Sequence, residues 1–110
     1  MPDQPLPDIP QADLEPLVAA VGNAVIDLLP DDWDAAVLDV TAAADGGLAH
    51  AITHPRRARA WVAPSIELAA RTADLLAPFR ARGEPWTRAR VEVDRTADGE
   101  WGYEVGFSFD

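Results

Sequence analysis

The stretch that decides the fold runs from Thr87 to Phe109 and reads TRARVEVDRTADGEWGYEVGFSF. Apolar side chains alternate with charged ones over residues 87–93, and an aromatic residue or valine stands at every second position over residues 101–109. Asp98-Gly99, between the two runs, suits a tight turn. Because successive side chains of a strand point to opposite faces, this pattern predicts two antiparallel strands with the four aromatic residues on one face.

That aromatic face needs a cover, and the chain offers two amphipathic helices for it. The first begins near Asp13, a suitable cap with Glu15 in the first turn, and is expected to stop at Pro30. Its apolar residues recur at helical spacing and form one stripe, to which Gly22 and Asn23 do not belong. The members of the stripe are Leu14, Leu17, Val18, Val21, Val25, Leu28 and Leu29.

The second helix is predicted to open at Pro64-Ser65 and to run to about Arg82. Gly83 then supplies the stop signal that is common after a helix. Proline lacks the backbone N–H and collides with the preceding turn, so Pro78 predicts a kink or break near Leu76.

A strand-like pattern fills the segment between the helices. Residues 37–41 and residues 48–53 alternate in the manner of strands, and Asp45-Gly46-Gly47 between them suits a hairpin turn. Residues 59–62 form a short third strand in one reading of this segment. The expected fold is therefore α+β, in the order α-β-β-(β)-α-β-β: an antiparallel sheet of four to five strands with both helices on one face.

The expected domain organisation is one domain, residues 13–110, behind a flexible proline-rich tail, residues 1–12. The tail holds four of the prolines, each of which fixes φ and removes a hydrogen-bond donor. No secretory signal or apolar run of about 20 residues is visible, so we expect a cytoplasmic protein without a membrane partner.

Charge is divided very unevenly along the chain. Residues 1–55 hold ten acidic and no basic residues, whereas residues 56–110 hold nine of each, so the net charge of −10 belongs to the first half. A segregated negative field attracts cations and basic protein surfaces and repels nucleic acid and anionic membranes. We therefore expect a basic protein partner and no nucleic acid. The cluster at Arg56, Arg57 and Arg59 is better explained by internal pairing with the acidic half.

The residues needed for catalysis are sparse. Cysteine is absent, and neither Ser65 nor Ser108 lies in a nucleophile context. His50 and His54 on one strand would stand about 13 Å apart, too far to share a metal ion; they are expected at the surface or in a hairpin. The sequence thus predicts a protein that is not an enzyme and that has neither a cofactor nor a metal site.

The densest group of carboxylates, Asp31, Asp32 and Asp34, surrounds Trp33 at the exit of the first helix. The spacing differs from that of a calcium loop, which requires a glycine and a terminal glutamate. Two readings remain open. The segment is either a solvated corner anchored by a buried Trp33, or a corner that docks against a basic partner.

Three stretches together resemble the YezG-type family of immunity proteins, which are antitoxins of polymorphic toxin systems. The resemblance spans roughly residues 14–109, and the order of elements agrees with it. The three stretches are Ile26-Asp27-Leu28-Leu29-Pro30-Asp31-Asp32-Trp33, Gly83-Glu84-Pro85-Trp86-Thr87, and Asp98-Gly99-Glu100-Trp101 leading to Phe107 and Phe109. This likeness implies a non-enzymatic protein that binds one cognate secreted toxin, of nuclease type in several cases, and neutralises it.

The candidate toxin-binding residues form the corner together with neighbouring acids that add to its field. They are Asp27, Asp31, Asp32, Trp33, Asp34, Asp39 and Asp45. The expected partner is a toxin domain with a basic surface, and the free protein is expected to be a monomer or a weak homodimer. An alternative is a small acidic secretion-type chaperone that dimerises and binds an effector segment. A third is an enzyme with an unrecognised site.

Overall fold

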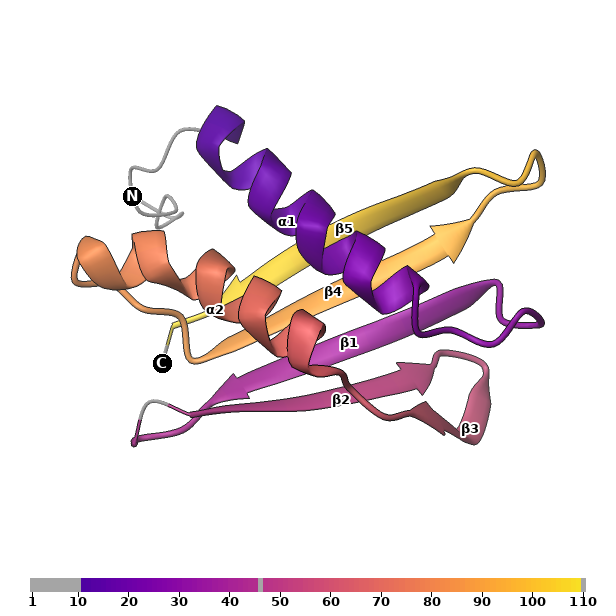
Figure 1. Ribbon diagram of the computed structural model, residues 1–110, viewed down its shortest axis with the longest axis horizontal. Helices are drawn as coiled ribbons and strands as arrows, with labels where there is room; N and C mark the ends of the chain where they lie inside the picture. Colours follow the sequence, from indigo (N-terminus) through magenta and orange to yellow (C-terminus); the bar gives the residue numbers. More distant parts are fainter. Residues whose placement is uncertain (1–10, 46, 110) are drawn as a thin grey trace, which may run out of the picture.

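The computed structural model describes residues 11–45 and 47–109 and confirms the α+β fold. Five strands form one antiparallel sheet in the spatial order β3-β2-β1-β4-β5, and both helices lie on the same face of it (Figure 1). The elements along the chain are α1 (Gln11–Ile26), β1 (Ala35–Ala42), β2 (Leu48–His54), β3 (Arg57–Val62), α2 (Ile66–Ala81), β4 (Arg88–Arg95) and β5 (Trp101–Ser108).

The C-terminal hairpin follows the predicted alternation closely. β4 and β5 pair in a continuous register in which Val93 lies opposite Tyr103 and Ala89 opposite Phe107. Ala89, Val91 and Val93 are buried beneath the helices, while the intervening charged residues of β4 are exposed. Gly99 has a φ of 89° in the turn, a value that glycine adopts without a steric penalty.

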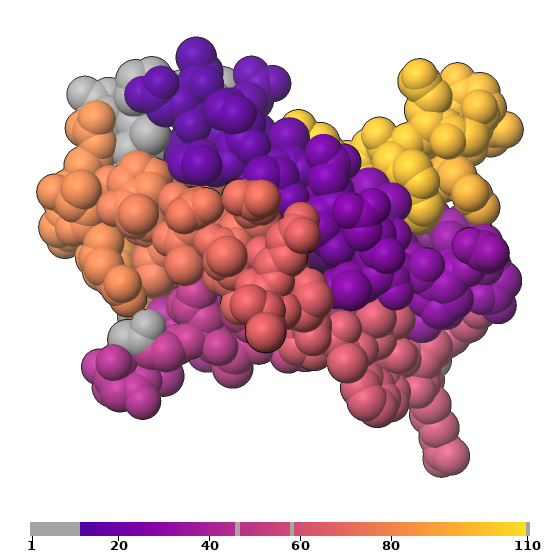
Figure 2. All heavy atoms as spheres, in the orientation of Figure 1, coloured from indigo at the N-terminus to yellow at the C-terminus, as the bar shows by residue number. Residues whose placement is uncertain are grey.

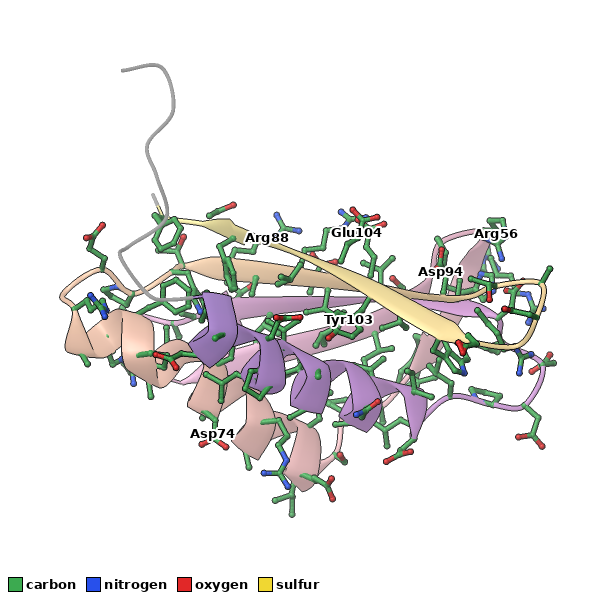
Figure 3. All side chains as sticks on the ribbon, turned by 90° about the horizontal axis from the view of Figure 1, so that it is seen from above. Arg56, Asp74, Arg88, Asp94, Tyr103 and Glu104 are labelled. Carbon is green, nitrogen blue, oxygen red and sulfur yellow. The ribbon has the colours of Figure 1, made fainter. Side chains whose placement is uncertain are left out.

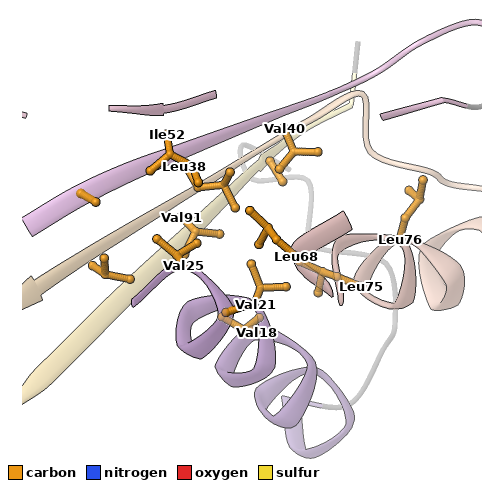
Figure 4. Packing of buried hydrophobic residues seen from close by; sticks show 14 of the residues in the cluster. Val18, Val21, Val25, Leu38, Val40, Ile52, Leu68, Leu75, Leu76 and Val91 are labelled. Atoms are coloured by element: carbon orange, nitrogen blue, oxygen red, sulfur yellow. The ribbon is translucent and has the colours of Figure 1, made fainter. Parts of the chain in front are cut away.

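The hydrophobic core lies between the sheet and the two helices (Figure 4). α1 contributes Val18, Val21 and Val25 at helical spacing, and α2 contributes Leu68, Leu75, Leu76 and Phe79. β1 lies at the centre of the sheet, paired with β2 on one side and β4 on the other. α2 begins as expected, because the Ser65 hydroxyl accepts a hydrogen bond of 3.1 Å from the Leu68 N–H and so caps the first turn.

Of the kink or break expected at Pro78, the break is wrong, since α2 runs without interruption to Ala81. Leu75, Leu76 and Phe79 are all buried on the sheet, and this packing holds the residues on both sides of Pro78 in helical position. Tertiary burial of about 2 kcal/mol for each large side chain can offset the local cost of a proline, about 3 kcal/mol.

The remaining differences concern boundaries. α1 ends at Ile26 rather than at Pro30, and it already includes Gln11 and Ala12, which the sequence places in the tail. The rest of the predicted tail lies outside the described residues. The third strand is present and longer than expected, and its ladder with β2 shifts register between Thr53 and His54. Within residues 11–45 and 47–109, neither helix has the length and apolar character needed to cross a bilayer.

Candidate functional site

Trp33 anchors the acidic corner from inside the protein. Its side chain is only 5% exposed and joins the hydrophobic core. The indole ring meets the His54 ring edge to face, with 5.1 Å between ring centroids. Its backbone N–H donates to the Pro30 carbonyl at 3.0 Å, closing the turn that follows α1. Trp33 therefore holds the corner in shape and presents little surface to a partner.

Two aspartates of the corner are already paired with arginines of the β2–β3 turn. Asp34 Oδ1 accepts from Arg56 Nη2 at 2.7 Å, and Asp32 Oδ2 accepts from Arg57 Nη1 at 3.2 Å. The predicted internal pairing is thus observed for Arg56 and Arg57, whereas the exposed Arg59 makes no ion pair with any described residue. All four paired side chains are largely exposed, so each pair contributes little to stability. Asp31 is exposed and makes no ion pair with another described residue.

Asp34 is also close to a buried histidine. The Arg56 N–H donates to His54 Nδ1 at 3.0 Å, so in the neutral ring the proton is on Nε2. That nitrogen is 3.4 Å from Asp34 Oδ1, in an alignment too poor for a regular hydrogen bond. Desolvation tends to raise the pKa of Asp34. The Arg56 guanidinium, the Asp34 backbone amide and His54 outweigh it and hold the pKa below its usual value.

The seven predicted site residues do not form one patch. Asp39 lies on the sheet face opposite the helices, where Arg88 Nη2 donates to it at 3.2 Å. Asp45 lies in the turn after β1 and accepts from the Gly47 N–H at 2.9 Å. The eight residues of β1 separate that turn from the corner by roughly 26 Å. Asp27 follows α1, beside Ser65 and Glu67 of a shallow depression. Only Asp31, Asp32 and Asp34 remain together.

The two histidines, expected at the surface or in a hairpin, lie on β2, which forms hairpins with β1 and with β3. Both lie on the helix-facing side of β2, where His54 is buried and His50 half-buried. His50 Nε2 is 2.7 Å from the Thr72 hydroxyl, which itself donates to the Ala69 carbonyl at 3.0 Å. Because the hydroxyl proton is engaged there, the imidazole is the donor to Thr72. Among the described residues, no three His, Asp or Glu side chains gather as metal ligands would.

This burial predicts a pH-dependent stability. Desolvation lowers the pKa of His50 below 6.5, so the unfolded chain takes up a proton at a higher pH than the folded protein does. The contribution of neutral His50 to the free energy of unfolding is therefore complete above pH 6.5. It is lost as the pH falls toward the pKa that His50 has in the folded protein. His50→Gln is expected to flatten the slope of unfolding free energy against pH below 6.5, as measured by urea denaturation. An unchanged slope would contradict this assignment.

The outer face of the sheet carries alternating charges. Figure 3 shows Arg88 and Glu104 on the side of the sheet away from the helices, while Asp74 lies on the outer side of α2. In register, Arg90 lies opposite Gly106 and Glu92 opposite Glu104. At the other edge of this face Trp61 is 70% exposed.

The helices do not cover the whole aromatic stripe, contrary to expectation. α1 crosses the strands obliquely, so its N-terminal half lies beyond β5 (Figure 1). Tyr103 is 42% exposed as a result, and Phe109, beyond the end of β5, remains exposed too. Gly22 on α1 is buried against Tyr103, where an added Cβ would be 3.6 Å from the ring.

A groove of about 410 Å³ lies between α1 and β5. Leu14, Glu15 and Val18 line its helical wall, and Tyr103, Val105, Gly106 and Phe107 line the strand wall. The sequence reasoning missed this groove, because a period-two pattern shows which residues share a face but not how far a helix covers them. Glu15 and Tyr103 are its only ionisable side chains, and they come from opposite walls.

Comparison with known proteins adds no family. No family model matches the chain, and no curated protein matches its sequence. The resemblance to YezG-type immunity proteins therefore stays a prediction that depends on the three quoted stretches.

Proposed function

We propose that this chain is an immunity protein, which binds a cognate secreted toxin through an acidic surface and neutralises it. The observation that carries the proposal is the exposed cluster of Asp31, Asp32 and Asp34, held at one end of the sheet by the buried Trp33. A rigid acidic projection of this kind complements the basic cleft that a nuclease-type toxin needs for its substrate.

The mechanism is electrostatic attraction followed by occlusion. With a net charge of −10, the protein and a basic toxin attract one another before contact, which raises the association rate. In the free protein Asp34 and Asp32 are paired with Arg56 and Arg57 through exposed ion pairs, which a basic toxin surface can replace at little cost. A standard interface of about 800 Å² per partner would fit on this end of the molecule and block the substrate cleft.

The positions of the serines support a binding role over catalysis. The Ser65 hydroxyl is engaged as a helix cap, and Ser108 ends an edge strand. Asp34 is exposed and paired with Arg56, and its pKa lies below the usual value, the opposite of the shift that a general acid requires. Among the described residues that line the groove beside β5, the ionisable side chains are Glu15 and Tyr103, and these lie on opposite walls.

Removing the corner charges is expected to slow toxin binding several-fold. The variant Asp31→Asn/Asp32→Asn/Asp34→Asn loses three negative charges and also leaves Arg56 and Arg57 without their acidic partners. With the two arginines counted, the formal charge of the corner changes from −1 (three aspartates, two arginines) to +2, so the local field reverses its sign. Stopped-flow association with the toxin domain, at several salt concentrations, measures the effect. The wild-type rate should fall as salt rises, since exposed charges are screened within about 8 Å at physiological ionic strength.

A control with the same change in net charge separates position from total charge. Asp13→Asn/Asp74→Asn/Glu84→Gln removes three exposed charges away from the corner. We expect this variant to bind nearly as fast as the wild type. Equal rates for the corner variant and the wild type, with both folded by circular dichroism, would exclude the corner from the interface.

A further inference from the structure

β5 is an edge strand, and only one of its two sides pairs with a neighbouring strand of the described sheet. It lies at the end of the sheet order and pairs along its eight residues only with β4. Its outward N–H and C=O groups thus have no strand partner in the described sheet. An edge of this length is a template to which a further strand can add.

α1 provides a roof over the space where such a strand would lie. The N-terminal half of the helix projects past β5 in Figure 1, and Figure 2 shows the β4–β5 turn standing apart from α1 at the end of the same strand. Leu14 and Val18 above, with Tyr103 and Phe107 beside them, make this groove apolar. A strand added to β5 would place every second side chain in the groove, where the half-exposed Tyr103 ring would be covered.

The other face of the same edge carries an unbalanced charge. Glu104 is the only charged residue of β5, and the register places it directly opposite Glu92. Like charges in this position destabilise a sheet. Glu92 has Arg90 Nε at 3.7 Å, whereas Glu104 makes no ion pair with any described residue. A basic side chain next to Glu104 on an added strand would balance it.

From the edge, the groove and Glu104 together, we propose that β5 binds an extended segment of the partner protein as a sixth antiparallel or parallel strand. Residues of that segment that point toward α1 are apolar, and those on the opposite face are basic. The inference rests on the proposed function in that it takes the partner to be the basic toxin. A second copy of this chain is a poor occupant, because it would bring another Glu104 and a further net charge of −10 to the same edge.

The test uses a capped peptide in which lysine and valine alternate, with a glutamate–valine peptide as the matched control. Binding is measured by calorimetry, and the bound edge is located by amide hydrogen exchange. We expect slowed exchange in residues 101–108 with the lysine peptide. The glutamate peptide should bind at least about tenfold more weakly, since like charges would meet at Glu104. N-methylation of alternate peptide residues along one edge should abolish binding, because it removes the N–H groups needed for the ladder.

Variants on the two faces of β5 test the apolar and charged contacts separately. Tyr103→Ala should weaken the lysine peptide about tenfold, by removing an aromatic contact in the groove. Glu104→Gln should weaken it about threefold, the value of one cross-strand ion pair. Asp74→Asn, which lies on the outer side of α2, should leave binding unchanged. Both β5 positions are exposed, so the fold should survive the substitutions.

Three outcomes would overturn the proposal. They are equal affinity for the two peptides, unaltered exchange in β5, or slowed exchange at the opposite edge strand, β3. Its failure can be told from failure of the proposed function. If toxin neutralisation survives in Tyr103→Ala and Glu104→Gln at wild-type affinity, the chain is still an immunity protein but β5 does not hold the toxin. If the lysine peptide binds as expected and no toxin is neutralised, the strand site stands and the function is wrong.

Discussion

Replacing Trp33 with alanine is expected to lower the free energy of unfolding by about 3–5 kcal/mol, the usual cost of removing a buried aromatic side chain. Trp33 is 5% exposed, packs in the core and meets the buried His54 ring. Since domains of this size are commonly stable by only 5–15 kcal/mol, the loss is a large part of the total. Urea denaturation followed by circular dichroism measures it.

A second tryptophan provides the control for this substitution. Trp61→Ala removes the same side chain from the outer face of the sheet, where it is 70% exposed, and should change the unfolding free energy by less than about 1 kcal/mol. Trp33→Phe should recover part of the loss, because it keeps an aromatic ring in the core. A loss below about 1 kcal/mol for Trp33→Ala would show that the corner is not anchored by this residue.

The sheet and its faces could be predicted because they follow from local alternation. β4 and β5 repeat with period two, and a glycine marks their turn, so strand, register and buried face follow from one pattern. The Ser65 cap of α2 was equally visible, because a serine before an apolar-periodic run is a local signal.

Features that depend on tertiary packing could not be predicted in this way. Pro78 breaks a helix by local rules, yet the burial of Leu76 and Phe79 on either side of it keeps α2 continuous. His50 is expected at the surface or in a hairpin, and it does lie in the hairpin of β1 and β2. Its actual partner, Thr72, comes from a helix 22 residues further along the chain. The oblique path of α1, which leaves the groove at β5 open, has no sequence signature at all.

For the candidate site, the sequence located the acids but not their partners. Asp31, Asp32 and Asp34 were grouped correctly because they are neighbours in the chain. Asp39 and Asp45, predicted to add to the field of the corner, lie away from it along β1, a separation that depends on the path of the strand. The pairing of Asp34 with Arg56 agrees with the prediction that Arg56 and its neighbouring arginines pair with acids of the first half of the chain. Its geometry, however, depends on the turn between β2 and β3.

The central claim, that this protein binds and neutralises a basic toxin, is tested most directly by co-expression. If the protein encoded immediately upstream of this chain ends in a small toxic domain, that domain is produced with and without the chain in the same cells. We expect growth to stop with the domain alone and to recover with the wild-type chain. The two proteins should then purify from these cells as a one-to-one complex. The corner variant should restore growth only at higher expression. Growth arrest that persists while the folded chain is abundant, or a native partner that is itself acidic, would contradict the account.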